Sequence, residues 1–208
     1  MAVDLRELAA PAHTAVLTME LQRGVVGDLA LIPDLARAVD EAGMIEPTAG
    51  LLRAARAAGV AIVHCTAEFR PDRAGSATNA PMLAALARTP GRLVAGSPEV
   101  AVVAELGQES SDLVAPRSHG VSPFGGTSLD VTLRNLGVRT VVATGVSVNL
   151  GVFGLALEAV NLGYRVVLPV DCVTGVPADY CRAVIDNSLA LLATRTTSDR
   201  LIAAWRPR

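Results

Sequence analysis

The sequence predicts an α/β fold built on a parallel, doubly wound sheet. Short β-branched runs alternate with longer segments rich in alanine and leucine along the 208 residues, which is the pattern of repeated strand–helix units. The predicted strands are apolar throughout, so both faces of the sheet are expected to be covered. Of the residues, 51% are hydrophobic and only 3% aromatic, so aliphatic side chains must fill the core. The length fits one domain, residues 1–208.

The predicted elements follow one another in a regular order. Strands are expected at 14–19, 60–65, 112–115, 138–143 and 164–170, with a short extended segment at 195–198. Helices are expected at 47–59, 79–90, 97–107, 127–137, 150–163 and 178–193, with one more at the end of the chain. Pro47 near the start and Gly59 at the end delimit the first helix. Thr127 as N-cap and Gly137 as terminal glycine delimit the fourth.

Composition excludes several classes of function. The net charge is −2 without a basic cluster, which argues against a nucleic-acid partner. No apolar run reaches the roughly 18 residues of a membrane helix, and the first residues lack the apolar core of a signal peptide. The three cysteines are widely spaced and form no metal-ligand cluster with the histidines, which fits the cytoplasm and predicts no metal. Phosphate-loop and dinucleotide fingerprints are absent, so no cofactor is expected. The hydrophobic fraction of 51% is high for a chain that folds in water, and this surplus favours a homo-oligomer.

Polar residues follow the predicted strands, where ligands bind in parallel sheets. Glu20 ends the first strand, and it is either a solvated acid or a carboxylate in a cleft that exchanges protons. Glu68 follows the second strand and is the best second carboxylate. Arg70 would bind an anionic substrate, unless its loop carries only local ion pairs in water. After the third strand, His119 is either a proton shuttle or a solvent-facing loop histidine.

The strongest feature is the turn at residues 144–151, TGVSVNLG, between a predicted strand and a predicted helix. Such turns present reactive groups at a helix N-terminus. The position where a nucleophile would be expected holds Gly151, so the turn offers backbone hydrogen-bond donors from Ser147 to Gly151 instead. The GxSxG serine elbow is absent.

Several stretches together resemble the isochorismatase-like hydrolases, a superfamily grouped with the cysteine hydrolases. They are the strand-end motif MELQ at 19–22, the RPD loop at 70–72, the block SPFGGTSLDVTLRNLGVRTVVATGVSVN, and its continuation ALEAVNLGYRVVLPVDCVTG. The resemblance implies a three-layer α/β/α fold with a six-stranded parallel, Rossmann-like sheet, assembled as a homodimer or homotetramer. It also implies a cis peptide bond between Val146 and Ser147.

Amidases of this superfamily use an Asp–Lys–Cys triad, from which the sequence differs at all three positions. By the resemblance, Glu20 stands at the acid, Ser118 at the lysine and Gly151 at the cysteine. Glycine carries no nucleophile, so a thioester mechanism is not expected. One branch of the superfamily, the isochorismatases proper, also has glycine there. In that branch the strand-end acid protonates a vinyl ether and water attacks the oxocarbenium ion, and Glu20 has the functional group for this chemistry.

Two hypotheses follow. In the first, the protein hydrolyses a C–O or C–N bond, such as a vinyl ether, in a small metabolite, anionic if Arg70 binds it. In the second, it is a catalytically inactive member that serves as a ligand-binding or oligomeric scaffold. The residues expected to act in catalysis are Glu20, Arg117 and His119. Those expected to bind the substrate are Glu68, Arg70, Ser118, Phe124, Ser147, Asn149 and Gly151.

Overall fold

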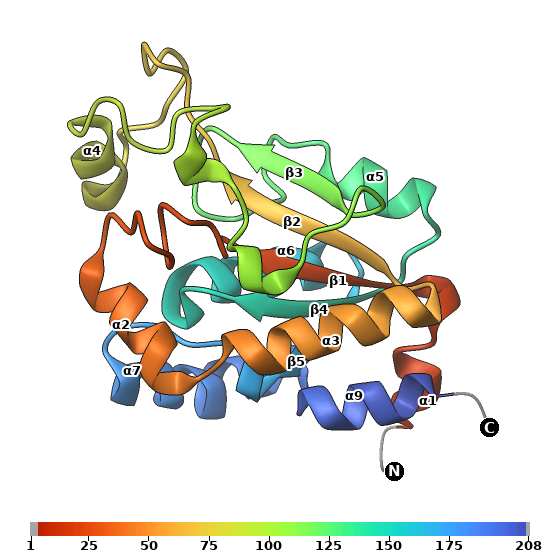
Figure 1. The fold of residues 1–208 in the computed structure, drawn as a ribbon. Coiled ribbons are helices and arrows are strands. Elements are labelled where there is room, and N and C mark those ends of the chain that lie inside the picture. Colours follow the sequence, from red (N-terminus) through yellow and green to blue (C-terminus); the bar gives the residue numbers. More distant parts are fainter. Residues whose placement is uncertain (1–3, 207–208) are drawn as a thin grey trace.

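A six-stranded sheet forms the centre of the molecule in the computed structural model, which describes residues 4–206. All neighbouring strands are parallel, in the order β3-β2-β1-β4-β5-β6 (Figure 1). The strands are β1 (Thr14–Met19), β2 (Ala61–Ala67), β3 (Leu113–Arg117), β4 (Thr140–Gly145), β5 (Arg165–Pro169) and β6 (Thr194–Thr196). The chain builds the sheet outward from β1 to β3 and then reverses direction at β4. This switch point is where an open parallel sheet forms a crevice beyond its carboxyl edge.

Helices cover both faces of the sheet and give the three layers. They are α1 (Leu5–Leu8), α2 (Pro33–Ala42), α3 (Ile45–Ala58), α4 (Pro81–Ala87), α5 (Leu129–Asn135), α6 (Phe153–Asn161), α7 (Ala178–Ala183), α8 (Ala190–Leu192) and α9 (Ser198–Trp205). One apolar cluster joins the sheet to α2, α3 and α9, and a second joins it to α5, α6 and α7. Figure 1 shows α3 across the front of the sheet and α4 apart from both layers, beyond the arrowheads of β2 and β3. No helix among residues 4–206 is long and apolar enough to span a membrane.

The two central strands approach each other so closely that one position must be glycine. Gly145 is paired with Met19 in the β1–β4 register and has φ +103°. A Cβ atom at this position would lie 2.2 Å from the backbone oxygen of Met19. Because no side chain tolerates that contact, the glycine at the second position of the TGVSVNLG turn is required by the sheet itself.

The strands agree with the sequence prediction to within a few residues, whereas four helical segments differ. Residues 97–107 do not form the predicted helix but two 3-10 turns, at Pro98–Val100 and Ala104–Leu106. The reason is a β-bridge between Val102 and Gln22, which holds the intervening residues extended. The helix over 178–193 contains a π-helical stretch at Val184–Leu189, and a π-helical turn at Val148–Val152 precedes α6. Helix α2 was not predicted, although Pro33 at its start and Gly43 in the left-handed conformation at its end are standard signals.

A buried polar chain ties α3 to the centre of the sheet. His64 on β2 is 1% exposed; its Nδ1 lies 2.7 Å from the Thr18 hydroxyl and its Nε2 lies 3.3 Å from a carboxylate oxygen of Asp112. Arg56 on α3 donates two hydrogen bonds to the same carboxylate. Every member is partnered, so the chain is a structural cross-link between the layers rather than a reactive group.

Candidate active site

An ion pair stands at the carboxyl edge of the sheet, beside the switch point. Glu20 directly follows β1, and Arg117 is the last residue of β3. Strand β2 lies between them in the sheet, and the two side chains meet beyond its end, where Arg117 donates from Nη2 to Glu20 Oε1. The exposed fraction is 7% for the Arg117 side chain and 18% for that of Glu20. The Nε and Nη1 atoms of Arg117 are buried without a hydrogen-bond partner among the described residues.

The segment after Glu20 is fixed by the amide of Gln22, which is fully buried. Its Nε2 donates to the carbonyls of Ala67 and Val100, both at 3.1 Å, and its Oε1 accepts from the Ala67 N–H at 2.7 Å. Glu20 itself has φ +52°, in the left-handed region. The glutamine thus anchors the chain that follows β1 to the end of β2, and this explains why a glutamine belongs two residues after the acid.

The turn after β4 has the cis peptide bond between Val146 and Ser147 that the resemblance implies. The Ser147 carbonyl accepts the N–H groups of Leu150 and Val152, and its hydroxyl donates to Asn149 Oδ1 at 2.8 Å. The Val148 N–H donates to the Thr174 carbonyl. Since the first N–H groups of a helix lack intrahelical partners, the amides of Asn149 and Gly151 are the candidate donors of this turn.

The ion pair and the turn face one cavity with two connected halves. The turn half, about 250 Å³, is lined by Ser147, Asn149, Leu150, Gly151 and Val176, among others. The apolar half, about 380 Å³, extends toward α4 and is lined by Leu31, Ala67, Phe69, Leu83, Leu86 and Leu93, among others. Both halves share Glu20, Arg117, Val25, Ile32 and Met82. The ion pair therefore stands where a bound molecule can contact it from either half.

The structure brings five of the ten predicted site residues to this cavity: Glu20, Arg117, Ser147, Asn149 and Gly151. Of the three triad positions inferred by resemblance, the acid and the glycine both line the turn half. The cation that meets Glu20 is Arg117, the residue before Ser118. Arg117 thus supplies the charge partner that the resemblance placed one residue later.

The other five predicted residues do not line either half. Glu68 accepts a hydrogen bond from the Thr66 hydroxyl at 2.8 Å. Arg70 is paired with Asp72, and its side chain is 66% exposed, so the local ion pair that the sequence left open is what forms. Ser118 and His119 lie in the loop after β3 at intermediate exposure.

Phe124 is a core residue, because it is 5% exposed and its ring stacks on Tyr164 with centroids 5.9 Å apart. Asp171, which also follows a strand, lies outside the cavity as well. Its carboxylate accepts the N–H and hydroxyl of Ser198, so it anchors the start of α9. The residues that sequence reasoning missed are the apolar ones, since a leucine or methionine in a loop or short helix carries no signal that separates a cavity wall from a core.

The three cysteines are free and buried, and none of them lines the cavity. Burial raises the pKa of Cys65 and of Cys172 to about 12, and it also raises the pKa of Cys181. A thiol of this kind is neutral at physiological pH and is a poor nucleophile. Within residues 4–206, no group of three or more His, Cys, Asp or Glu side chains is placed to bind a metal ion.

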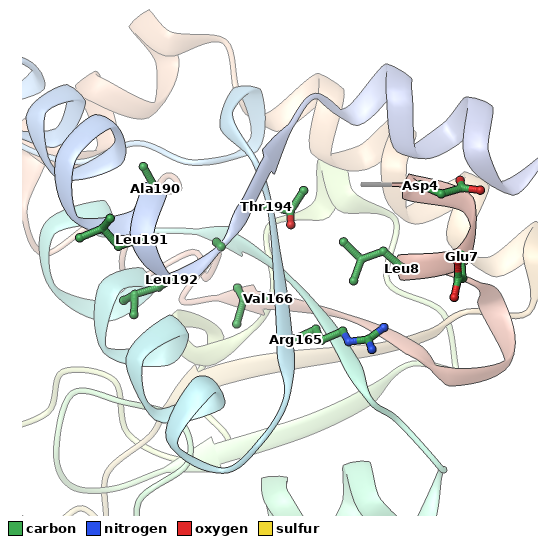
Figure 2. Close-up of a pocket in the computed structure, with 10 residues that line it drawn as sticks. Asp4, Glu7, Leu8, Arg165, Val166, Ala190, Leu191, Leu192 and Thr194 are labelled. Atoms are coloured by element: carbon green, nitrogen blue, oxygen red, sulfur yellow. The ribbon is translucent and has the colours of Figure 1, made fainter. Parts of the chain in front are cut away.

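A second cavity, about 530 Å³, lies at the opposite edge of the sheet. Figure 2 shows Glu7 and Leu8 of α1 facing Arg165 and Val166 at the start of β5, with Leu191 and Leu192 on the other side. This cavity is remote from the switch point and from the turn after β4. The carboxyl-edge cavity is therefore the candidate active site, because it alone contains the Glu20–Arg117 pair.

The fold and this site define a three-layer α/β/α protein with an acid at a strand end, and comparison identifies the family. The isochorismatase domain model matches residues 14–200, so the chain belongs to the isochorismatase family. It is 27% identical to an uncharacterised isochorismatase family protein of Bacillus subtilis over 164 residues, 77% of each chain. It is 33% identical to the streptothricin hydrolase of Streptomyces noursei over 162 residues, which are 76% of this chain but 48% of that protein.

The chain is also similar to a relative with a different name and to two solved structures of isochorismatase family proteins. The chain is 29% identical over 133 residues to the maleamate amidohydrolase of Pseudomonas putida, covering 62% of this chain and 59% of that one. An isochorismatase family protein from Desulfovibrio vulgaris superposes with a TM-score of 0.76 at 26% identity, covering 90% of this chain and 95% of that one. One from Burkholderia thailandensis gives 0.76 at 28% identity, covering 93% and 96%.

Proposed function

We propose that this protein is a hydrolase that acts on a small molecule by acid–base chemistry, with Glu20 as the group that moves the proton. One observation carries the proposal: Glu20 is paired with Arg117 and faces the 147–151 turn across an open cavity that no thiol lines. The carboxyl group of Glu20 can accept a proton, or donate one when it is protonated. Arg117, as the partner, holds the carboxylate in position.

The reaction follows from these groups. Glu20 takes a proton from water as the water oxygen bonds to the substrate carbon. The bond from that carbon to the leaving oxygen or nitrogen then breaks, and the proton passes from Glu20 to the leaving atom. Donors of the 147–151 turn stabilise the negative charge that develops on a carbonyl oxygen. For a vinyl ether the order is reversed: protonated Glu20 delivers its proton to the enol carbon, and water adds to the resulting oxocarbenium carbon while returning a proton to Glu20. The hemiketal formed in this way then breaks its bond to the ether oxygen, which leaves as an alcohol with the hydroxyl proton while the carbonyl forms.

The relatives support hydrolysis in general rather than one substrate, because one is a streptothricin hydrolase and another a maleamate amidohydrolase. An inactive scaffold remains the alternative. An open cavity favours the enzyme, since a scaffold that has lost its activity does not need a space of this size beside a partly buried ion pair.

The test is Glu20→Gln, which keeps the size of the side chain and removes its ability to exchange a proton. We expect turnover of a responsive vinyl ether or small amide to fall by at least 100-fold, on the order of the contribution of a general acid or base, while the melting temperature stays near that of the wild type. Glu68→Gln, outside the cavity, is the matched control and should retain activity. Alkylation with iodoacetamide should leave activity unchanged; inactivation by it, or full activity of Glu20→Gln, would exclude this mechanism.

A further inference from the structure

The apolar half of the cavity has a composition that specifies what it binds. It lies between α4, the segment around Leu31 and Ile32, and Phe69 after β2. Its charged side chains are Glu20 and Arg117, which face each other at its base, and Thr89 is the one other polar side chain in its lining. Most of the remaining lining side chains are aliphatic or aromatic, and apolar surface of this kind favours an apolar ligand group.

The wall of the apolar half formed by Phe69 and the chain after α4 is held in place by side-chain contacts. The guanidinium of Arg73 lies 4.5 Å from the centroid of the Phe69 ring and donates to the carbonyls of Thr89 and Arg92 at 2.9 and 2.7 Å. It therefore links Phe69 to the chain that follows α4. Gly24, which also lines this half, approaches Leu93 and Glu99 so closely that a Cβ would lie 2.6 Å from Leu93 Cδ2. The Phe69 N–H in turn donates to the Leu93 carbonyl at 2.8 Å, so these contacts fix the Phe69–Leu93 wall independently of any ligand.

We infer that the substrate is uncharged and carries an alkyl or aryl arm, which occupies the apolar half while the scissile group lies against Glu20 and the 147–151 turn. An uncharged substrate fits because the two charges of the lining already neutralise each other, and a further anion would face the Glu20 carboxylate without a free cation from Arg70. This inference rests on the proposed function for the position of the scissile group, but the arm and its binding site are defined by the cavity alone.

Binding of a homologous series tests the arm without requiring turnover. The probes are acetamide, butanamide and hexanamide, with hexanoate as the charged comparison, titrated by calorimetry into the full chain. A buried methylene contributes about fourfold in affinity, the equivalent of about 0.8 kcal/mol. Hexanamide has four more methylenes than acetamide and should thus bind about 200-fold more tightly, and it should also bind more tightly than hexanoate. An affinity independent of chain length would refute the binding of an alkyl arm in the apolar half. Tighter binding of hexanoate than of hexanamide would refute the inference that the substrate is uncharged.

A pair of variants locates the arm. Ala85 on α4 lines the apolar half, whereas its neighbour Ala84 does not. We expect Ala85→Asp to abolish the gain in affinity with chain length, since it places a carboxylate among the apolar side chains, and Ala84→Asp to retain it. Both variants carry the same cost in helix propensity, so matched melting temperatures show that the chain remains folded. If Ala85→Asp keeps the chain-length dependence, the arm does not bind here and the inference is wrong.

The two proposals fail separately. Binding that depends on chain length, without turnover of any amide or vinyl ether, would support the arm-binding site and refute the proposed function. Turnover that depends on Glu20 but not on the length of the arm would retain the proposed function and remove this inference.

Discussion

Gln22 offers the sharpest test of how the site is held, because its role is independent of the substrate. Replacing it by methionine keeps nearly the same shape and removes the three hydrogen bonds to Ala67 and Val100. Three backbone groups then lose a side-chain partner in a buried place. Each group buried without a partner costs about 1–3 kcal/mol, and partial relaxation reduces the sum. We expect Gln22→Met to lower the free energy of unfolding by about 3–5 kcal/mol, a large part of the stability of an ordinary domain.

The measurement is urea unfolding followed by circular dichroism. With a slope of about 3 kcal/mol per M, typical of the upper range, the midpoint should fall by about 1–2 M. Gln108→Met is the control, since Gln108 is exposed and its replacement should stay within about 0.5 kcal/mol. A loss below about 1 kcal/mol for Gln22→Met would show that the amide does not anchor the segment after β1, and would refute the reasoning.

Three further outcomes are expected. Gly145→Ala should prevent folding or lower the melting temperature severely, because its Cβ would lie 2.2 Å from the Met19 oxygen. The control is Gly137→Ala, which is also at positive φ but has open space around it, and it should lower the free energy of unfolding by only about 1 kcal/mol. Equal losses of stability in the two variants would contradict the steric argument. Burial lowers the pKa of His64 below 6.5, so the unfolded chain is protonated first and the free energy of unfolding should fall as the pH drops below 6.5. Between pH 7 and pH 5, the urea midpoint should therefore decrease less in His64→Gln than in the wild type. An identical decrease in both proteins would exclude His64 as the source of the pH dependence. Sedimentation velocity should find a dimer or tetramer, as the surplus apolar residues predict, and a monomer at micromolar concentration would refute that expectation.

The sequence predicted the sheet well because its signals are local. Each strand is a continuous apolar run, and burial on both faces demands that pattern. The residues at the carboxyl ends of β1 and β4, Glu20 and Gly151 among them, could be located because a parallel sheet sets them at one edge. The cis bond before Ser147 was implied only by the family resemblance, since no spacing in a single sequence encodes it.

What the sequence did not reveal depends on contacts between distant segments. The extended conformation of Val102 follows from its bridge to Gln22, far away in the chain, so local helix propensity was misleading for residues 97–107. The charges of Arg70 and Asp72 satisfy each other, and nothing in their types distinguishes such a pair from a substrate clamp. The apolar half was invisible for a related reason: whether Leu86 faces a core or an empty space is decided by what α4 packs against.

Glu20 and Arg117 are 97 residues apart in the chain, and this separation bears on how the protein reaches its working state. Three strands must align before the carboxylate and the guanidinium can meet, and contacts at such separation form late because loop closure costs entropy. A molecule that binds at this pair would therefore recognise only chains in which β1, β2 and β3 have docked. Ligand binding at the carboxyl edge should therefore report the fraction of chains in which these three strands are in place, which a helix signal alone does not measure.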